Sequence, residues 1–267
     1  MKRKAAVANQ FYEGDPRRLE KQLDTFFEPG LEQKKVIAVV SPHAGYIYSG
    51  KVAGAVFSRI NPASTYVILG PNHRGFGSSV GIMSAGSWEM PWGEVSINHD
   101  LATNIGENSP LVSEDEFAHQ FEHSLEVQVP FINRISPQAT IVPISLSIRD
   151  YNPCEEIGHA LATAISDYGE VTTIVASTDM SHYEPHEVAK RKDQPAIDAI
   201  VALEPKKLFD YVKKHRVSMC GVIPTVITLL AAKELGAVNA ELILYMTSGE
   251  TSGDYHQVVG YAGLCIS

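Results

Sequence analysis

Short runs of β-branched and aliphatic residues alternate along this chain with segments of helical periodicity. Val36–Val40, Tyr66–Leu69 and Val171–Ala176 are almost continuously apolar and are separated by longer segments with helical spacing. Strands that are apolar along their whole length are typical of parallel sheets whose connecting helices cover both faces. We therefore expect one three-layer α/β/α domain over residues 1–267, with a mostly parallel central sheet.

The same patterns predict the remaining elements. Pro143 lies in one predicted strand and cannot donate a ladder hydrogen bond, so we expect that strand to be an edge or to carry a bulge. The Gly-rich segment from Gly75 to Asn98 indicates a hairpin or a long loop, and Phe121–Gln128 is expected to open a helix. The other predicted elements are helices over Asp15–Phe27, around Val52, Val56 and Ile60, around Ile157, Leu161 and Ile165, and over Gly221–Leu235, and strands at Thr140–Ile144, Leu242–Met246 and Val258–Ala262.

Charge and cysteine content exclude several classes of protein. The net charge is −9, and the longest basic runs, Lys190–Lys192 and Lys213–Arg216, resemble solvated helix faces, so we expect no nucleic-acid partner. Three widely spaced cysteines without a CxxC pair argue against a disulfide framework and suit a reducing cytoplasm. No segment approaches the length of a membrane span, and no apolar region follows the basic N-terminus as in a signal peptide.

Polar residues follow the predicted strands at the points where they end. His43 comes after the first strand, His73 after the second, and Asp179 and His182 after the strand ending at Ala176. Ligands of open parallel sheets bind outside the carboxyl ends of the strands, so these side chains are expected to converge on one edge. A single histidine in this setting is more often structural, but three of them favour a shared site.

Three further positions are candidates for this site. Cys220 precedes an apolar helix, whose positive end favours a thiolate, although a buried inert cysteine fits the same sequence. Glu122 and His123 could supply polar groups or hydrogen bonds to site residues, or belong to an ordinary helix face. Tyr46 could line a pocket, although packing in the core explains it equally well.

Five motifs follow one another along the chain: Ser41–Tyr46, Leu69–His73, Glu122–Glu126, Ser177–His182 and Cys220–Gly221. Together they resemble the Memo family, which in bacteria and archaea appears as the AmmeMemoRadiSam system protein B, and the resemblance spans nearly the whole chain. It implies a fold like that of the class III extradiol (LigB-like) dioxygenases, which hold non-haem Fe(II) with two His and a carboxylate.

The resemblance also implies roles for individual residues. His43, His73 and Cys220 match the positions of a two-His-one-Cys metal set. His182, with Asp179 beside it, matches the acid/base histidine, while Asn72, Glu122, His123 and Tyr46 are expected around the site. Because Cys replaces the carboxylate, the metal is expected to be iron, copper or zinc, with its identity open. AMMECR-like and radical-SAM proteins are the partners that the bacterial family name implies.

These observations leave three hypotheses for function. The first is a metal-dependent, dioxygenase-related enzyme acting on an unidentified small molecule. The second is a non-catalytic binding or adaptor protein that uses the same pocket for a peptide or small ligand. The third is a metal-independent hydrolase with Cys220 as nucleophile and His182 or His43 as base.

Overall fold

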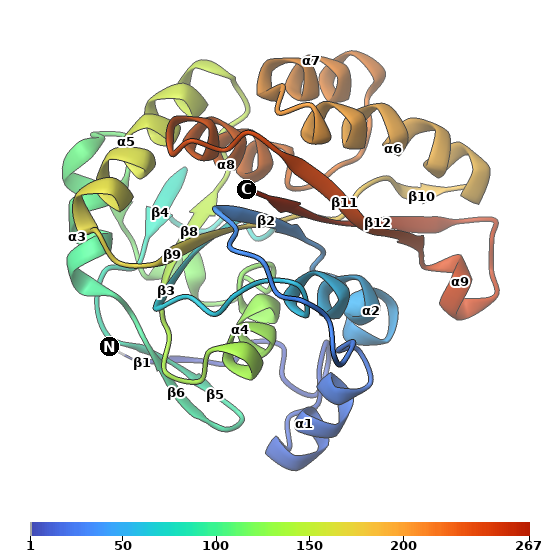
Figure 1. Cartoon of the computed structure of the whole chain (residues 1–267), viewed down its shortest axis with the longest axis horizontal. Coiled ribbons are helices and arrows are strands. Elements are labelled where there is room, and N and C mark those ends of the chain that lie inside the picture. Colours follow the sequence, from blue (N-terminus) through green and yellow to red (C-terminus); the bar gives the residue numbers. More distant parts are fainter. Residues whose placement is uncertain (1) are drawn as a thin grey trace.

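The computed structural model describes residues 2–267 and, within that range, shows a central sheet of nine strands (Figure 1). The four middle strands run parallel in the order β2 (Ala38–Ser41), β9 (Thr172–Ser177), β3 (Thr65–Pro71) and β8 (Thr140–Leu146). Nearly all of their residues are buried, as expected for apolar strands with helices on both sides. Their carboxyl ends therefore meet at one edge of the sheet.

Antiparallel strands extend the sheet on both sides of this parallel centre. β12 (Val258–Ile266) pairs with β2, with β11 (Ala240–Thr247) and, further along, with the short β10 (His182–Glu184). On the other side, β4 (Val80–Ile82) pairs antiparallel with β8, and β7 (Ser113–Glu114) adds parallel to β4. The predicted parallel sheet is thus correct for the centre and is mixed at its sides.

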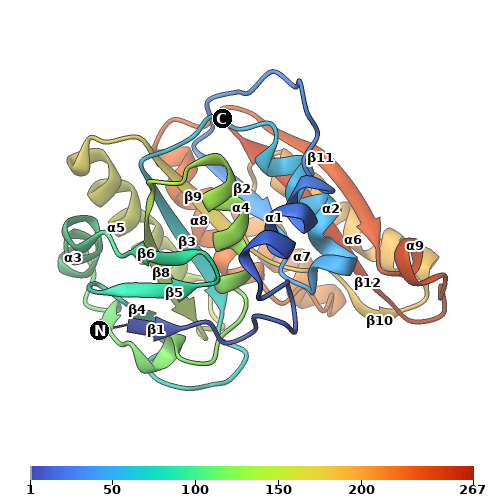
Figure 2. The same cartoon turned by 90° about the horizontal axis from the view of Figure 1, so that it is seen from below.

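Helices cover both faces of the sheet (Figures 1 and 2). Successive side chains of β2 point to opposite faces, so that Val40 joins one hydrophobic cluster and Val39 the other. The face with Val40 carries α3 (His99–Asn108), α5 (Asn152–Tyr168), α6 (His186–Val201), α7 (Pro205–His215) and α8 (Val222–Glu234). The face with Val39 carries α1 (Pro16–Asp24), α2 (Tyr46–Phe57) and α4 (Val129–Ile135). The short helix α9 (Gly249–Ser252) follows β11. The expected three-layer α/β/α architecture is confirmed.

A second, small sheet packs beside α4 on the lower side of the molecule (Figure 2). β5 (Ser87–Met90) and β6 (Gly93–Ser96) form an antiparallel hairpin, and β1 (Lys2–Lys4) adds parallel to β5. The hairpin predicted within Gly75–Asn98 is therefore present. Its Trp88 is completely buried and joins the hydrophobic cluster of this face.

Two expectations about local structure are wrong. The strand with Pro143 is neither an edge nor bulged, because β8 lies between β3 and β4 in continuous register. The Pro143 carbonyl accepts from Met83 N just beyond the end of β4 at Ile82, so the Pro143 nitrogen, which has no hydrogen to donate, faces that side as well. Phe121–Gln128 does not open a helix directly: a turn and the 3₁₀ segment Glu126–Gln128 precede α4 at Val129.

Helix starts and cysteine states otherwise follow the sequence. Asp15 caps α1 by accepting a hydrogen bond from Arg18 N at 3.0 Å, although the helix ends at Asp24 rather than Phe27. Cys154, Cys220 and Cys265 are all free thiols. Within residues 2–267 every helix is too short or too polar to cross a bilayer.

Candidate metal centre

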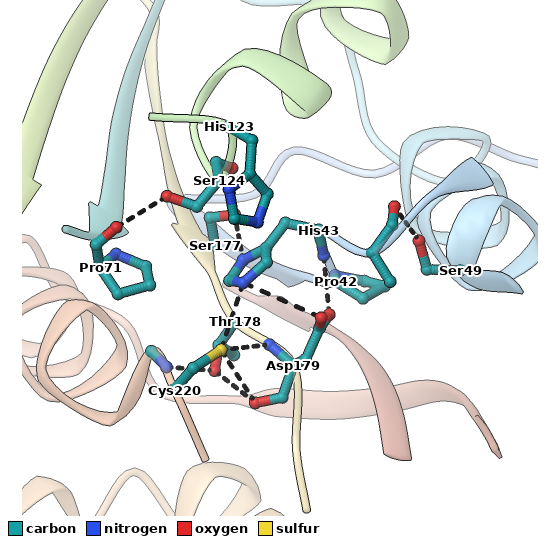
Figure 3. A network of polar contacts seen from close by, with 12 residues as sticks. Pro42, His43, Ser49, Pro71, His123, Ser124, Ser177, Thr178, Asp179 and Cys220 are labelled. Atoms are coloured by element: carbon teal, nitrogen blue, oxygen red, sulfur yellow. Dashed lines mark hydrogen bonds and ion pairs between the residues drawn. The ribbon is translucent and has the colours of Figure 1, made fainter. Parts of the chain in front are cut away.

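Four separate segments bring polar side chains together at the carboxyl edge of the parallel strands, and Figure 3 shows three of these side chains, His43, Asp179 and Cys220. His43 follows β2, His73 follows β3, Asp179 follows β9, and Cys220 lies just before α8. His43 Nε2 lies 3.2 Å from Cys220 Sγ, across 177 positions of sequence. One candidate ligand atom each of His43, His73 and Cys220 lies within 4.8 Å of the other two. The predicted convergence of these residues therefore occurs.

The hydrogen bonds around Ser177 fix the protonation of His43. The Ser177 hydroxyl donates its single proton to the Ser124 carbonyl at 2.6 Å and accepts from Gln128 Nε2 at 2.9 Å. The remaining contact, 3.0 Å from His43 Nδ1, therefore requires Nδ1 to be the donor. The lone pair of His43 is then on Nε2, facing Cys220. Burial and the neighbouring His73, His123 and His182 hold the pKa of His43 well below its usual range, so the ring is neutral.

Glu122 fixes His73 in the same way. The buried carboxylate accepts from His73 Nδ1 at 2.9 Å and from His73 N at 2.6 Å. It also accepts from the backbone N–H groups of His123 and Ser124. Burial alone would raise the pKa of Glu122, but the hydrogen bonds and charge of His73, with Ser124 N, lower it to about 2. A carboxylate holding Nδ1–H of a histidine is a common support for a metal ligand, because it directs Nε2 outward.

His182 and Asp179 lie on the other side of Cys220. His182 Nδ1 donates to the carbonyls of Met180 and Ser218, at 2.8 and 2.9 Å, which again leaves Nε2 free. Asp179 Oδ1 accepts from His43 N at 2.8 Å, and its Oδ2 lies 3.9 Å from His43 Nε2. Burial raises the pKa of Asp179 to about 6, although the hydrogen bond from His43 N acts to lower it. One ligand atom each of Asp179, His182 and Cys220 also lies within 4.8 Å of the others.

Cys220 differs from the sequence expectation in its protonation. The residue lies before the N-cap Gly221 of α8, yet burial and the charge of Asp179 raise the pKa of its thiol well above the usual range. The hydrogen bond from Asp179 N, at 3.2 Å, opposes this shift without cancelling it. The helix end alone therefore does not produce a thiolate here. A bound cation would, because metal coordination displaces the thiol proton.

The other predicted site residues occupy different places. His123 stacks on His73 with ring centroids 4.6 Å apart, and burial lowers its pKa to about 4. The Asn72 side chain donates from Nδ2 to Phe76 O and accepts at Oδ1 from Gly75 N. Asn72 therefore stabilises the loop that carries His73. Tyr46 lies in the core, where its hydroxyl donates to Val127 O, which is the packing alternative that the sequence left open.

Ser177, Gln128 and Ser124 belong to the site and were not identified from the sequence. All three are completely buried and form the hydrogen bonds that orient His43. Serine and glutamine are too common to mark a site by themselves. Ser177 nevertheless directly follows the apolar run of β9, a position that would have justified including it.

A buried ion pair ties the N-terminal segment to the segment that carries Glu122. Arg3 donates to Glu126 Oε2 and His119 O at 2.6 Å and to Glu122 O at 2.8 Å, while its guanidinium lies over the Trp88 ring. Glu126 also accepts from the backbone N–H groups of Ala6 and Val7 and from the hydroxyl of Tyr12. The chain before α1 therefore fixes the backbone beneath Glu122.

The donor set fits a transition-metal ion. His43 presents its Nε2 lone pair to the thiol, and the Nδ1 atoms of His73 and His182 are held by hydrogen bonds, so that the Nε2 atoms of these two rings are free of them. His, His and Cys together suit iron, copper or zinc rather than magnesium or calcium, which prefer oxygen ligands. The His73 side chain is 31% exposed, so the cluster is open to solvent at this histidine.

Known proteins resemble this chain over nearly its whole length. The family described as Memo-like protein matches residues 3–265. A MEMO1 family protein of Methanopyrus kandleri is 41% identical, covering 99% of this chain and 98% of that protein, and one of Aquifex aeolicus is 41% identical with 98% of each covered. An uncharacterized protein of Escherichia coli K12 shares the fold, with a TM-score of 0.57 at 14% identity, over 85% of this chain and 99% of that one. The chain therefore belongs to the Memo-like protein family.

Proposed function

We propose that this protein is a metal-dependent enzyme whose centre is held by His43, His73 and Cys220. The observation that carries the proposal is the hydrogen bonding that holds Nδ1 of both histidines. Ser177 and Glu122 each occupy the Nδ1–H of one ring, which leaves both Nε2 lone pairs available beside the sulfur. Two imidazoles and one thiolate also leave a coordination position for substrate, as catalytic sites require.

The remaining residues of the cluster support proton transfer. His182 Nδ1 is held by two carbonyls, which leaves Nε2 for proton exchange, and one ring nitrogen of His182 lies within 4.8 Å of candidate ligand atoms of Cys220 and Asp179. His182 can therefore accept or donate a proton at a ligand bound beside it. Asp179 holds the backbone of His43 through the hydrogen bond from His43 N to its Oδ1. A redox metal in this site would supply electron transfer or oxygen chemistry, and zinc would supply Lewis acidity.

Metal analysis of variants tests the proposal. The full-length protein, purified without chelator and loaded anaerobically with Fe(II), Cu(I) or Zn(II), should bind close to one equivalent of at least one metal. Cys220→Ala and His43→Ala should lose it. Cys265→Ala is the matched control, because Cys265 is a free thiol on β12, outside the cluster. Wild-type protein that binds none of these ions would refute the proposal.

A second candidate rests on the contact between Cys220 and His43. A thiol 3.2 Å from an imidazole nitrogen is the geometry of a cysteine nucleophile with its base. Burial favours the neutral form of both groups, which works against an activated thiolate. Covalent labelling of Cys220 by iodoacetamide, at a rate unchanged by chelators, would favour this hydrolase over the metal centre.

The adaptor hypothesis and the predicted partners stay predictions. Pull-down with AMMECR-like and radical-SAM proteins tests them directly. Capture that survives Cys220→Ala would place such partners on a surface other than the metal centre.

A further inference from the structure

Tyr183, the residue after His182, has a backbone conformation that tyrosine rarely adopts. Its φ is +57°, in the left-handed region. Of the other described non-glycine residues with positive φ, Asn9 is of a type that tolerates the conformation, and Leu203 and Arg216 follow helices, where a left-handed residue is common. Among residues 2–267, Tyr183 is thus the one non-glycine residue that is left-handed inside a strand.

A bulge in β10 explains where this strain comes from. His182 pairs with Val259, and Glu184 pairs with the adjacent Val258, so Tyr183 is the extra residue between them. Bulges of this kind change the direction of a side chain and are common beside active sites. Both neighbours are fixed: His182 N donates to Ser218 Oγ at 2.7 Å, and Glu184 pairs with Lys192. The surrounding structure therefore holds Tyr183 in this conformation.

The fold gains little packing from the Tyr183 ring in return. The side chain is 74% exposed, and within residues 2–267 its hydroxyl has no hydrogen-bond partner. A small polar residue such as Asn would accept the same backbone more easily. Strained residues that contribute nothing to the core are concentrated at binding sites, where the strain serves the ligand.

The ring lies beside the proposed metal centre. Its centroid is 6.1 Å from that of His182, at an interplanar angle of 61°. An exposed aromatic face at this position is available to a ligand bound at the metal.

We propose that Tyr183 is a ligand-contacting residue, and that its exposed ring packs against a planar, ring-containing part of the molecule held at the centre. The inference rests on the proposed function, since it needs a metal to hold the ligand. His182 would act on the reacting atoms, while Tyr183 would select the ligand by the shape of its non-reacting part.

Two hydroxamates with the same metal-binding group test the role of the ring. Benzohydroxamate carries a phenyl ring and acetohydroxamate a methyl group, and both are titrated calorimetrically into the zinc-loaded full-length chain. Aromatic contact predicts that wild type prefers benzohydroxamate by about tenfold. Tyr183→Asn should remove this preference and leave acetohydroxamate binding unchanged, whereas Tyr183→Phe should retain it.

Thermal unfolding of the metal-free variants supplies a second readout. Tyr183→Asn should melt at the same temperature as wild type or higher, because Asn relieves the strain and no packing is lost. A lower melting temperature would show that the ring supports the fold, and would overturn the proposal. An unchanged tenfold preference in Tyr183→Asn, or no preference in wild type, would overturn it as well. In those cases zinc and acetohydroxamate still bind, whereas absence of zinc binding would refute the metal centre itself.

Discussion

Replacing Glu122 with glutamine should weaken both the fold and the metal site. The carboxylate accepts four N–H groups: Oε1 takes His73 Nδ1 and the backbone nitrogens of His123 and Ser124, and Oε2 takes His73 N. A glutamine has one oxygen for these four donors. If that oxygen replaces Oε1, the amide NH₂ faces His73 N, donor against donor.

The pKa of Glu122 gives the size of the effect on stability. A fall from 4.5 to about 2 corresponds to roughly 3 kcal/mol of stabilisation by the ionised form. Because the folded pKa lies below the unfolded one, this contribution is complete above pH 4.5 and is lost as the pH falls toward 2. Urea unfolding of the metal-free proteins at pH 7 should therefore show Glu122→Gln to be less stable by about 3 kcal/mol, with a smaller difference near pH 3.

The same substitution should reduce zinc affinity by about 10- to 100-fold, because His73 loses the group that directs its Nε2. Competition with a chromophoric chelator measures this. Glu107→Gln is the matched control, since Glu107 is exposed on α3 and makes no side-chain hydrogen bond within residues 2–267. Zinc binding by Glu122→Gln within threefold of wild type would show that the carboxylate does not position His73.

Further predictions concern the scaffold. Gly54→Ala, in the middle of α2, would place a Cβ 2.4 Å from a backbone oxygen and should destabilise the protein by more than about 2 kcal/mol in urea unfolding. The Cβ of Gly106→Ala on α3 meets open space, so this substitution should stabilise the protein by about 0.5–1 kcal/mol. Arg3→Met leaves Glu126 charged and buried, and should cost about 3–5 kcal/mol; a cost below 1 kcal/mol would contradict this reading of the pair. Burial lowers the pKa of His119 to about 4, so stability should fall as the pH drops from 6.5 to 4, by up to about 3 kcal/mol for this residue. His119→Gln should flatten that part of the curve, and an unchanged curve would exclude His119 as its source.

The sequence predicts the centre of the fold better than its sides. Runs such as Tyr66–Leu69 are apolar enough to require burial on both faces, which only a covered parallel sheet provides. The antiparallel strands β4 and β10 have three residues each, too few for periodicity to reveal. The prediction of an edge or a bulge at Pro143 was wrong because the Pro143 nitrogen, which has no hydrogen to donate, faces the end of β4. The length of this neighbouring strand is a tertiary property that the local sequence does not show.

The site divides in a similar way. His43, His73, His182 and Cys220 are recognisable because each follows a strand or precedes a helix at the same sheet edge. Their protonation is not recognisable, because it depends on hydrogen bonds from distant segments, such as that between Ser177 and Ser124. The helix-end argument for a Cys220 thiolate failed for the same reason: burial beside Asp179 outweighs the helix end.

The separation of the ligands along the chain has a consequence for biogenesis. His43 and Cys220 lie 177 residues apart, so a ribosome must release most of the polypeptide before the second can approach the first. A nascent chain therefore exposes its histidines and thiols individually, without the chelate effect that gives a finished site its affinity. On the proposed function, loading of the centre follows folding of the segments that carry His43 and Cys220, and metal content would then report how much of a preparation has reached its native topology.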